Sequence, residues 1–222
     1  MKSLLFCTSY CSNDKIWKQR IEKWFNHHKQ CGLEYDKLLI IDDGSPEIPV
    51  WDCITTYDSP FEEEPAENHV LIHFQKNLGR NSIHDYPGWF RSFSFAAKFA
   101  KKFNYDKIIH IESDAYVLSK NLIHYINNIT DGWTTLWCPL HRYPETAIQI
   151  IGKDKINVLY NIVSGGYGPY KNKAIETCLP FTNINRQFKG DRYFEYTTDV
   201  PLDSDYSCQS DHITFDPTNF KI

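Results

Sequence analysis

Short apolar runs alternate with amphipathic segments along the first two thirds of the chain. Apolar residues at helical spacing predict a helix that begins near Asp14 and ends at Gly32, a second over 87–103 and a short one over 121–128. Strands that alternate with helices imply an α/β fold with a mostly parallel central sheet and helices on both faces. Uninterrupted apolar runs predict the buried strands of this sheet at 4–8, 37–41, 70–74 and 107–111.

The rest of the chain gives weaker signals. Residues 46–68, rich in Pro, Glu and Asp, are predicted to be mostly irregular. Strands are predicted at 134–138 and 147–151 on either side of a turn, and a helix at 171–178 after a glycine-rich loop. After Pro180 the chain is polar, and we expect a loop that orders only on binding.

Composition limits the classes of protein that this chain can represent. The 222 residues suit a single domain, and 41% hydrophobic with 23% charged residues is typical of a globular protein. A net charge of -4 argues against nucleic acid as a partner, since phosphate binding needs a basic face. The seven cysteines form no CxxC pair, which favours reduced thiols. The N-terminal apolar run is too short for a signal peptide and no transmembrane segment is predicted, so we expect a cytoplasmic protein.

Two acidic clusters follow two of the predicted parallel strands. They are Asp42-Asp43-Gly44-Ser45 and Glu112-Ser113-Asp114. Open α/β sheets bind ligands at the carboxyl ends of their strands, where a carboxylate can accept hydrogen bonds from a ribose or a base. Taken alone, the first cluster is equally typical of an acidic turn or a helix cap.

The second cluster has the chemistry of a metal site. Side chains two positions apart in an extended chain point to the same side, so Glu112 and Asp114 can converge on one cation. Carboxylate oxygens suit Mn²⁺ or Mg²⁺, which bridge to substrate phosphates. The competing interpretation is a solvated turn after a strand, but the apolar strand before it places these acids where the chain leaves a core.

Together these motifs resemble a known family. The segment 40–45 resembles the nucleotide-binding strand end of family-2-like GT-A glycosyltransferases. Asn77-Leu78-Gly79-Arg80, then Arg91 on a helix, then 105–115 resemble that family's next block, which ends in an Asp-x-Asp motif, here Glu-x-Asp. Order and spacing match over roughly residues 3 to 120. The resemblance implies one GT-A (Rossmann-like) domain over 1–222, with a nucleotide-sugar-binding half at 1–120 and an acceptor-binding half at 121–222.

The resemblance also implies roles for individual residues. Asp114 would bind the metal, Glu112 would contact the metal or the sugar, and His212 is a candidate third ligand, although a surface position in a polar tail is slightly favoured for it. Either Arg80 or Arg91 would meet the diphosphate or shape its pocket. The residues expected to contact the nucleotide sugar are Thr8, Ser9, Asp42, Asp43, Asn77, Arg80, Arg91, Glu112 and Ser113.

The acceptor side is predicted from the second half of the chain. Gly165, Gly166 and Tyr167 resemble the family's acceptor loop, with a flexible turn as the alternative. An inverting enzyme also needs a carboxylate base, a requirement that a retaining enzyme does not share. Asp191 is the first candidate and Glu195 and Asp199 are alternatives, although surface charge would explain each of the three.

The predicted function is metal-dependent transfer of a sugar from a nucleoside-diphosphate sugar to a glycan, lipid-linked or protein-linked acceptor. A sugar-phosphate nucleotidyltransferase is the first alternative. It is disfavoured because 7–12, after the first strand, contains no glycine. A catalytically inactive sugar-nucleotide-binding module is the second. The presence of Asp43 and Asp114, with His212 as a candidate addition, argues against it, and metal-enhanced nucleotide binding with turnover would decide.

Overall fold

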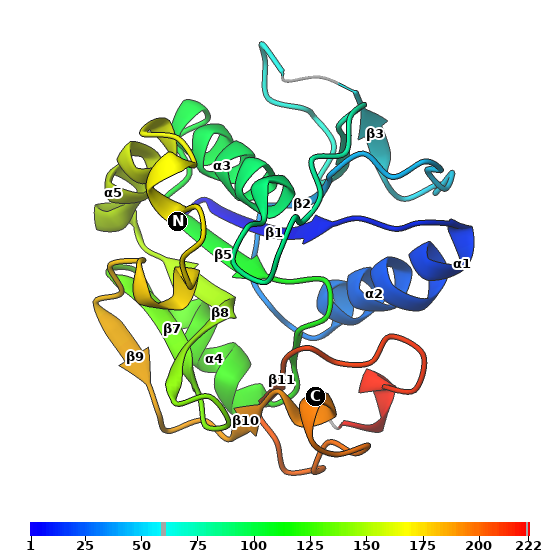
Figure 1. Cartoon of the computed structure of the whole chain (residues 1–222), viewed down its shortest axis with the longest axis vertical. Helices are drawn as coiled ribbons and strands as arrows, with labels where there is room; N and C mark the ends of the chain where they lie inside the picture. The colour runs from blue at the N-terminus through cyan, green and yellow to red at the C-terminus, as the bar shows by residue number, and fades with distance from the viewer. Residues whose placement is uncertain (59–60, 221) are drawn as a thin grey trace.

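A mixed, mostly parallel sheet forms the centre of the molecule. The computed structural model describes residues 1–58, 61–220 and 222, and in this part of the chain eight strands lie in the order β3-β4-β2-β1-β5-β8-β7-β9 (Figure 1). Within this sheet, the described strand pairs are parallel except β5–β8 and β7–β8, which are antiparallel. The strands are β1 (Ser3–Ser9), β2 (Lys37–Asp42), β3 (Thr55–Tyr57), β4 (His69–His73), β5 (Lys107–Ile111), β7 (Trp133–Cys138), β8 (Tyr143–Ile151) and β9 (Asn183–Asn185).

Helices cover both faces of this sheet, as the sequence predicts. Leu4 and Phe6 of β1 pack with α3 (Pro87–Lys102) and α5 (Lys153–Ser164), whereas Leu5 and Cys7 face the opposite core. This alternation follows from the two-residue period of a strand. The opposite core is closed by α1 (Asp14–Ile16), a π-helical turn η1 (Trp17–Glu22), α2 (Lys23–Gln30) and α4 (Lys120–Asn128).

A second, three-stranded sheet folds the C-terminal region back toward β5. Its order is β10 (Gly190–Asp191), β11 (Tyr206–Ser207) and β6 (Tyr116–Val117). The backbone N–H of Ser210 donates to the carbonyl of Asp114 over 2.9 Å, which fixes this region beside the end of β5. Short 3₁₀ turns complete the region at Gly168–Tyr170, Ile175–Thr177, Tyr193–Glu195 and Pro217–Asn219.

The second half of the chain contains the main difference between the predicted and the observed helices. The helix predicted at 171–178 is wrong, because Asn172 has a left-handed φ of 60° and only the 3₁₀ turn at 175–177 forms. The helix of this region is α5, whose buried Ile156, Leu159 and Val163 recur at helical spacing. The stretch predicted to be mostly irregular contains one short strand, β3, and residues 59–60 lie outside the described residues.

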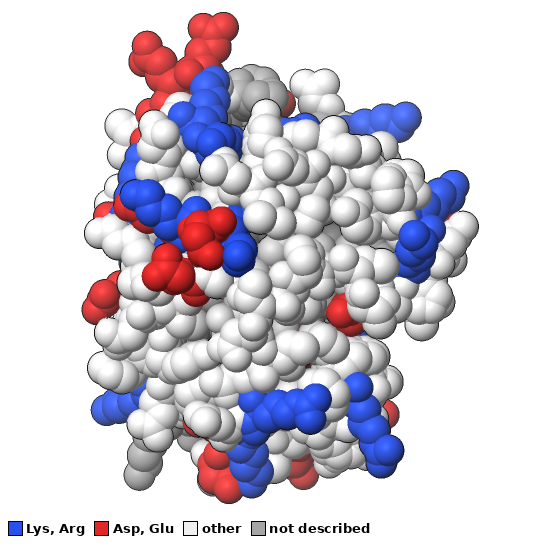
Figure 2. All heavy atoms as spheres, turned by 90° about the vertical axis from the view of Figure 1, so that its left-hand side faces the viewer, with Lys and Arg blue, Asp and Glu red and all other residues white. Residues whose placement is uncertain are grey.

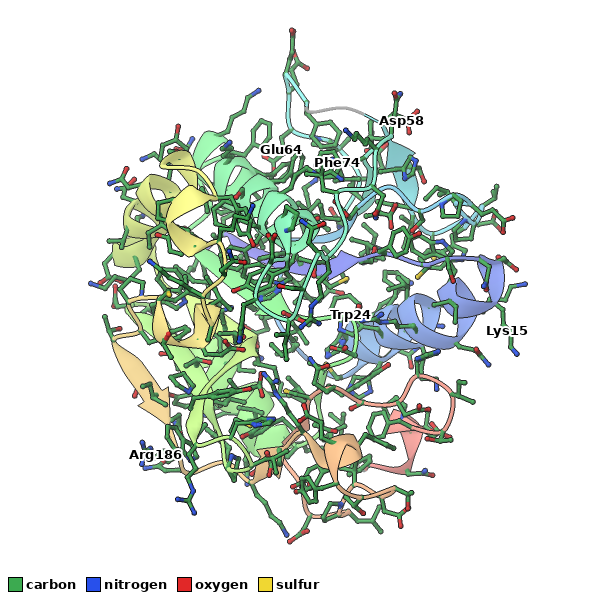
Figure 3. All side chains as sticks on the ribbon, viewed as in Figure 1. Lys15, Trp24, Asp58, Glu64, Phe74 and Arg186 are labelled. Atoms are coloured by element: carbon green, nitrogen blue, oxygen red, sulfur yellow. The ribbon has the colours of Figure 1, made fainter. Side chains whose placement is uncertain are left out.

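The polar region after Pro180 also differs from expectation. The sequence predicts a loop, but this region forms β9, β10 and β11 in the structure without a bound ligand. Phe215 also packs on Tyr116 with ring centroids 4.9 Å apart. The composition of this region is polar overall, but its buried aromatic and small side chains provide the contacts that hold it in place. At its edge, Figure 3 shows Arg186 near β9 at the periphery of the molecule, whereas Trp24 of α2 lies inside.

Among the described residues, none of the helices combines the length and the apolar character needed to span a bilayer. On the face seen in Figure 2, Lys and Arg side chains lie mainly toward the margins with Asp and Glu among them, around a broad area of uncharged residues.

Candidate active site

A cavity of about 810 Å³ opens at the carboxyl edge of the parallel strands. The register pairs Ser9 at the end of β1 with Asp42 at the end of β2, and β5 ends beside them on the other side of β1. Both predicted acidic clusters therefore lie at one edge of the sheet. Of the residues predicted to bind the nucleotide sugar or metal, those that line the cavity are Thr8, Ser9, Asp43, Asn77, Arg80, Glu112, Ser113 and Asp114.

The two aspartates of the first cluster have different environments. Asp42 is fully buried and does not line the cavity. Its carboxylate accepts hydrogen bonds from the backbone N–H and hydroxyl of Ser45, at 2.8 and 2.6 Å, and pairs with His73 Nδ1 at 2.9 Å. Asp42 thus holds the turn after β2, while its neighbour faces the cavity.

Asp43 is enclosed by the loop that follows β4. Its Oδ2 accepts from the backbone N–H groups of Leu78 and Gly79 at 3.1 and 2.8 Å, and from Asn77 Nδ2 at 3.1 Å. Arg91, on α3, donates to the other oxygen. Burial raises the pKa of Asp43, and the bonds from Gly79 and Arg91 oppose that rise. The Arg91 guanidinium is engaged in this contact with Asp43, and Arg91 does not line the cavity.

Glu112 lies at the end of β5, where its backbone N–H still pairs with Ala147 of β8 at 2.8 Å. Trp89 Nε1, on α3, donates to Glu112 Oε1 at 2.9 Å. Burial, together with the neighbouring carboxylates of Asp114 and Glu145, raises the pKa of Glu112, whereas Arg192 and Trp89 lower it. While no cation lies beside it, this environment favours the neutral form of the Glu112 carboxyl group.

Within the described part of the chain, Asp114, unlike Glu112, forms an ion pair with an arginine side chain. Its Oδ2 pairs with Arg20 Nη2 at 3.1 Å, and its side chain is 17% exposed. Its Oδ1 is buried and has no hydrogen-bond partner in the described structure. Buried polar atoms normally have a hydrogen-bond partner. A buried carboxylate oxygen without one, in a residue that lines a cavity, is therefore available to bind a ligand or a cation.

The fit to a divalent cation rests on these two carboxylates. No group of three or more His, Cys, Asp or Glu side chains is assembled as a metal site in the part of the chain that the structure describes. Mg²⁺ is commonly held by one or two carboxylates with substrate phosphates and water as the remaining ligands. The unsatisfied Oδ1 of Asp114 and the adjacent Glu112 fit that arrangement. His212 lies outside the cavity, and its carbonyl accepts from Lys23 Nζ at 2.9 Å.

The other end of the cavity is formed by the second half of the chain. Arg192 makes two hydrogen bonds to the fully buried Glu145, at 2.8 and 3.0 Å. Glu195 lies 3.7 Å from Arg192 and pairs with His141 Nε2 at 2.6 Å. Residues that line this end are His141, Tyr143, Thr146, Ala174, Ile175, Glu176, Arg192 and Glu195.

The remaining candidates lie away from this cavity. Asp191 is buried, and its Oδ1 accepts from the backbone N–H groups of Leu140 and Arg192 at 3.2 and 2.9 Å. Asp199 is exposed and does not line the cavity. Tyr167 donates to Asp85 at 3.0 Å and, like Gly165 and Gly166, does not line the cavity.

Sequence reasoning missed several cavity residues that lie beside residues it selected. Arg192 follows the chosen Asp191, and consecutive side chains of an extended chain point to opposite sides. Trp89 is two positions from Arg91 on the same helix. Arg20 directly precedes Ile21 of the apolar stripe that predicts the first helix, but nothing in the sequence connects it to Asp114, 94 positions later.

Comparison with solved structures agrees with the fold that the motifs imply. One match is a glycosyltransferase involved in the glycosylation of the major capsid of PBCV-1, with a TM-score of 0.51 and 13% identity over 99% of both chains. The chain has the GT-A glycosyltransferase fold. A second match is the galactosyltransferase LgtC in complex with donor and acceptor sugar analogs, with a TM-score of 0.51 and 10% identity over 93% of this chain and 86% of that one.

Comparisons at the level of sequence add nothing to this assignment. No protein-family model matches the chain, and no curated protein matches it. At 10–13% identity the structural likeness establishes the GT-A fold alone. The chemistry of this chain must therefore be argued from its own cavity.

Proposed function

We propose that this protein is a glycosyltransferase that moves a sugar from a nucleoside-diphosphate sugar to a hydroxyl of a glycan, lipid-linked or protein-linked acceptor. One observation carries the proposal. Asp43, Glu112 and Asp114, from two different strand ends, line a single cavity at the carboxyl edge of a sheet with the GT-A fold. A cavity of about 810 Å³ is within the usual range for small-molecule sites.

The donor occupies the end of the cavity formed by β1, β2 and β5. The Asp43 carboxylate accepts a hydrogen bond from the nucleoside, and Thr8 and Ser9 lie beside it at the end of β1. Asn77 contributes indirectly as well, because its side-chain amide also donates to the backbone carbonyl of Asp43 at 2.8 Å and holds the loop closed. Donor recognition is thus built on a hydrogen-bonded, buried carboxylate whose position is fixed before the ligand arrives.

Asp114, with Glu112, holds a divalent cation, Mn²⁺ or Mg²⁺, in this proposal. When bound, such an ion neutralises the charge that develops on the leaving diphosphate. The chain's own contribution is to orient the carboxylates. Trp89 fixes one oxygen of Glu112, and Arg20 fixes one oxygen of Asp114, leaving the other free.

The acceptor occupies the end formed by β8 and the C-terminal region. Glu195 is the one residue of the three proposed bases that lines the cavity. Its 2.6 Å contact with His141 Nε2 suggests that the two act together to take the proton from the acceptor hydroxyl. The hydroxyl oxygen then forms the new bond to the sugar carbon as the bond from that carbon to the diphosphate breaks.

Nucleotide titration tests the proposal most directly. UDP, GDP and dTDP are titrated by calorimetry with and without Mn²⁺, and the corresponding sugar nucleotides are assayed for release of the diphosphate. We expect one nucleotide to bind more tightly with Mn²⁺ and its sugar donor to be hydrolysed slowly. Absence of metal-enhanced binding for all three nucleotides would refute the proposal.

An Asp114→Asn variant separates chemistry from folding. It should lower turnover by at least roughly a hundredfold, the usual scale for removing an electrostatic contact to the reacting groups. The thermal melt should remain close to that of the wild type, since the amide retains an oxygen to accept from Arg20. Global unfolding of Asp114→Asn would mean that Asp114 serves the fold instead.

A further inference from the structure

Arg20 is a charged side chain that lines the cavity but uses little of its hydrogen-bonding capacity. It lies on the π-helical turn η1, lines the cavity and is 28% exposed. Its guanidinium makes one hydrogen bond to the described residues, the 3.1 Å contact with Asp114, and its Nε is buried without a partner. A guanidinium carries five N–H donors, so most of its capacity is unused. π-Helical turns occur frequently at functional sites.

The other arginines near the site are already engaged. Arg192 is matched by the carboxylates of Glu145, Glu176 and Glu195, at 2.8, 3.6 and 3.7 Å. Arg91 is bound to Asp43 and to the carbonyl of Lys76. Arg80 donates to two carbonyls of its own exposed loop at 3.0 Å.

We propose that Arg20 is a diphosphate-binding residue of the donor site, and that its ion pair with Asp114 is the resting arrangement that the donor and its cation replace. The inference rests on the proposed function and adds a residue that neither the motifs nor the fold indicates. Arginine suits the role because its planar fork matches phosphate oxygens in two parallel hydrogen bonds.

Charge balance explains why the exchange is favourable. Without a ligand, Arg20 neutralises an Asp114 carboxylate that has left bulk water. A donor that arrives with its cation brings positive charge to Asp114 and negative charge to Arg20. The Arg20 guanidinium then pairs with the diphosphate while the Asp114 carboxylate pairs with the cation. Neither charged group is left buried without a partner.

The opposite signs of two binding changes test this inference. In Arg20→Gln, Mn²⁺ alone should bind about two- to fivefold more tightly, because a competing, partly exposed ion pair is lost. A nucleoside diphosphate at saturating Mn²⁺ should bind roughly 10- to 100-fold more weakly, the scale of a lost charged hydrogen bond. Free Mn²⁺ is followed by electron paramagnetic resonance, and UDP, GDP and dTDP by calorimetry.

Two further variants complete the experiment. Lys18→Gln removes a cation from the same turn, where Lys18 pairs with Asp14 and is 64% exposed, and it should change neither affinity. Arg20→Lys keeps the charge but not the fork, so it should preserve the Mn²⁺ affinity and weaken nucleotide binding, and it provides the measurement if Arg20→Gln does not fold.

Other results of these binding measurements would overturn either the inference about Arg20 or the proposed function. If Mn²⁺ and nucleotide affinities fall together in Arg20→Gln, Arg20 orients Asp114 for the cation and does not bind the diphosphate. Unchanged nucleotide affinity in Arg20→Gln overturns the inference while leaving the proposed function intact. If the wild-type protein binds no nucleotide with Mn²⁺, the proposed function is wrong and the inference about Arg20 fails with it.

Discussion

Trp89 Nε1 donates a 2.9 Å hydrogen bond to Glu112 Oε1, and this contact joins the first turn of α3 to the end of β5. The indole is held in turn by Phe93, with ring centroids 4.7 Å apart and ring planes inclined by 13°. A carboxyl group that lines the cavity is thereby oriented by a stacked pair of aromatic side chains on a neighbouring helix.

The first prediction follows from that hydrogen bond. Trp89→Phe should lower kcat roughly 10-fold, because Glu112 loses the donor that orients its carboxyl group, and a buried acceptor left without its partner costs about 1–3 kcal/mol. The aromatic contact with Phe93 is largely kept, so the thermal melt should change little. Steady-state kinetics with the sugar nucleotide that the wild type accepts provide the measurement.

Trp133→Phe is the matched control for Trp89→Phe. Trp133 Nε1 donates to Gln149 Oε1 at 3.0 Å in the buried core, away from the cavity. Here the same chemical change should cost about 1–3 kcal/mol of unfolding free energy, because a buried amide oxygen loses its donor. The activity per folded molecule should persist. Equal losses of activity in the two variants would show that Trp89 has no particular role.

A second prediction concerns the close approach of α3 to Asp43. A Cβ at Gly88 would lie 2.1 Å from Asp43 Oδ2 and 2.9 Å from the backbone nitrogen of Gly79. Gly88→Ala must therefore displace the carboxylate, although alanine favours a helix by about 1 kcal/mol. We expect nucleotide affinity to fall at least roughly 10-fold by calorimetry, the loss of one good hydrogen bond.

Gly168→Ala controls for the added methyl group. A Cβ at Gly168 would meet nothing within 4 Å, and the residue does not line the cavity. Its nucleotide affinity should equal that of the wild type. If Gly88→Ala also binds normally, Asp43 does not need its observed position to recognise the nucleotide.

The sequence predicted the sheet and the acids at the end of the cavity formed by β1, β2 and β5, because local signals determine both. Short apolar runs rich in β-branched residues and bounded by turn signals are typical of buried strands, and the acids that follow β2 and β5 must meet at one sheet edge once the strands are parallel. His110 of β5 is buried and stacks on Phe6 with ring centroids 4.6 Å apart, and burial lowers its pKa to about 3.

The end of the cavity formed by β8 and the C-terminal region could not be predicted in the same way. Glu145, Arg192 and His141 come together through the β7–β8 hairpin and the second sheet, whose strands are too short to leave a periodic pattern. Asp191 and Arg192 are adjacent in sequence, but only the arginine lines the cavity. Which of two neighbours faces the ligand depends on the register of β10 with β11, and that is a property of the tertiary structure.

The third prediction separates the acids that were candidates for the base. Glu195→Gln should lower kcat about a hundredfold or more at unchanged stability, the usual contribution of a positioned proton acceptor. His141→Gln should have a similar effect, and the double variant should be little worse than either, because the pair acts as a unit. The measurements are kcat and the thermal melt for each variant.

Asp191→Ala provides the contrast to Glu195→Gln. It leaves the N–H groups of Leu140 and Arg192 without their acceptor, so the free energy of unfolding should fall by about 1–3 kcal/mol. Its activity should be retained at a temperature where it is folded. Full activity of Glu195→Gln would argue against a base at this position and favour a retaining reaction.

The fourth prediction concerns the acid limit of stability. His28 is fully buried between Trp24 and Tyr116, with its Nδ1 at 3.0 Å from the carbonyl of Trp24. Burial lowers the pKa of His28 well below its ordinary 6.5, and the neighbouring His27 adds to that shift. The folded protein therefore keeps the ring neutral at a pH where the unfolded chain protonates it.

The direction of the effect follows from proton linkage. Below about pH 6.5 the unfolded state binds a proton that the folded state excludes, so stability is present above this pH and is lost as the pH falls. One such histidine contributes a decline of about 1.4 kcal/mol per pH unit. Urea unfolding of the wild type between about pH 7.5 and about pH 5.0 should show this decline, with His27 and His110, whose pKa values are also lowered by burial, adding to it.

Replacing His28 isolates its share of the decline. His28→Leu removes the titrating group and keeps an apolar side chain in the core, so the unfolding free energy should fall less steeply with acid, by about one proton's worth of slope. His124→Gln, at an exposed position on α4, should leave the slope unchanged. Equal slopes in the wild type and His28→Leu would mean that His28 gains its proton without unfolding, and that the core around Trp24 admits water.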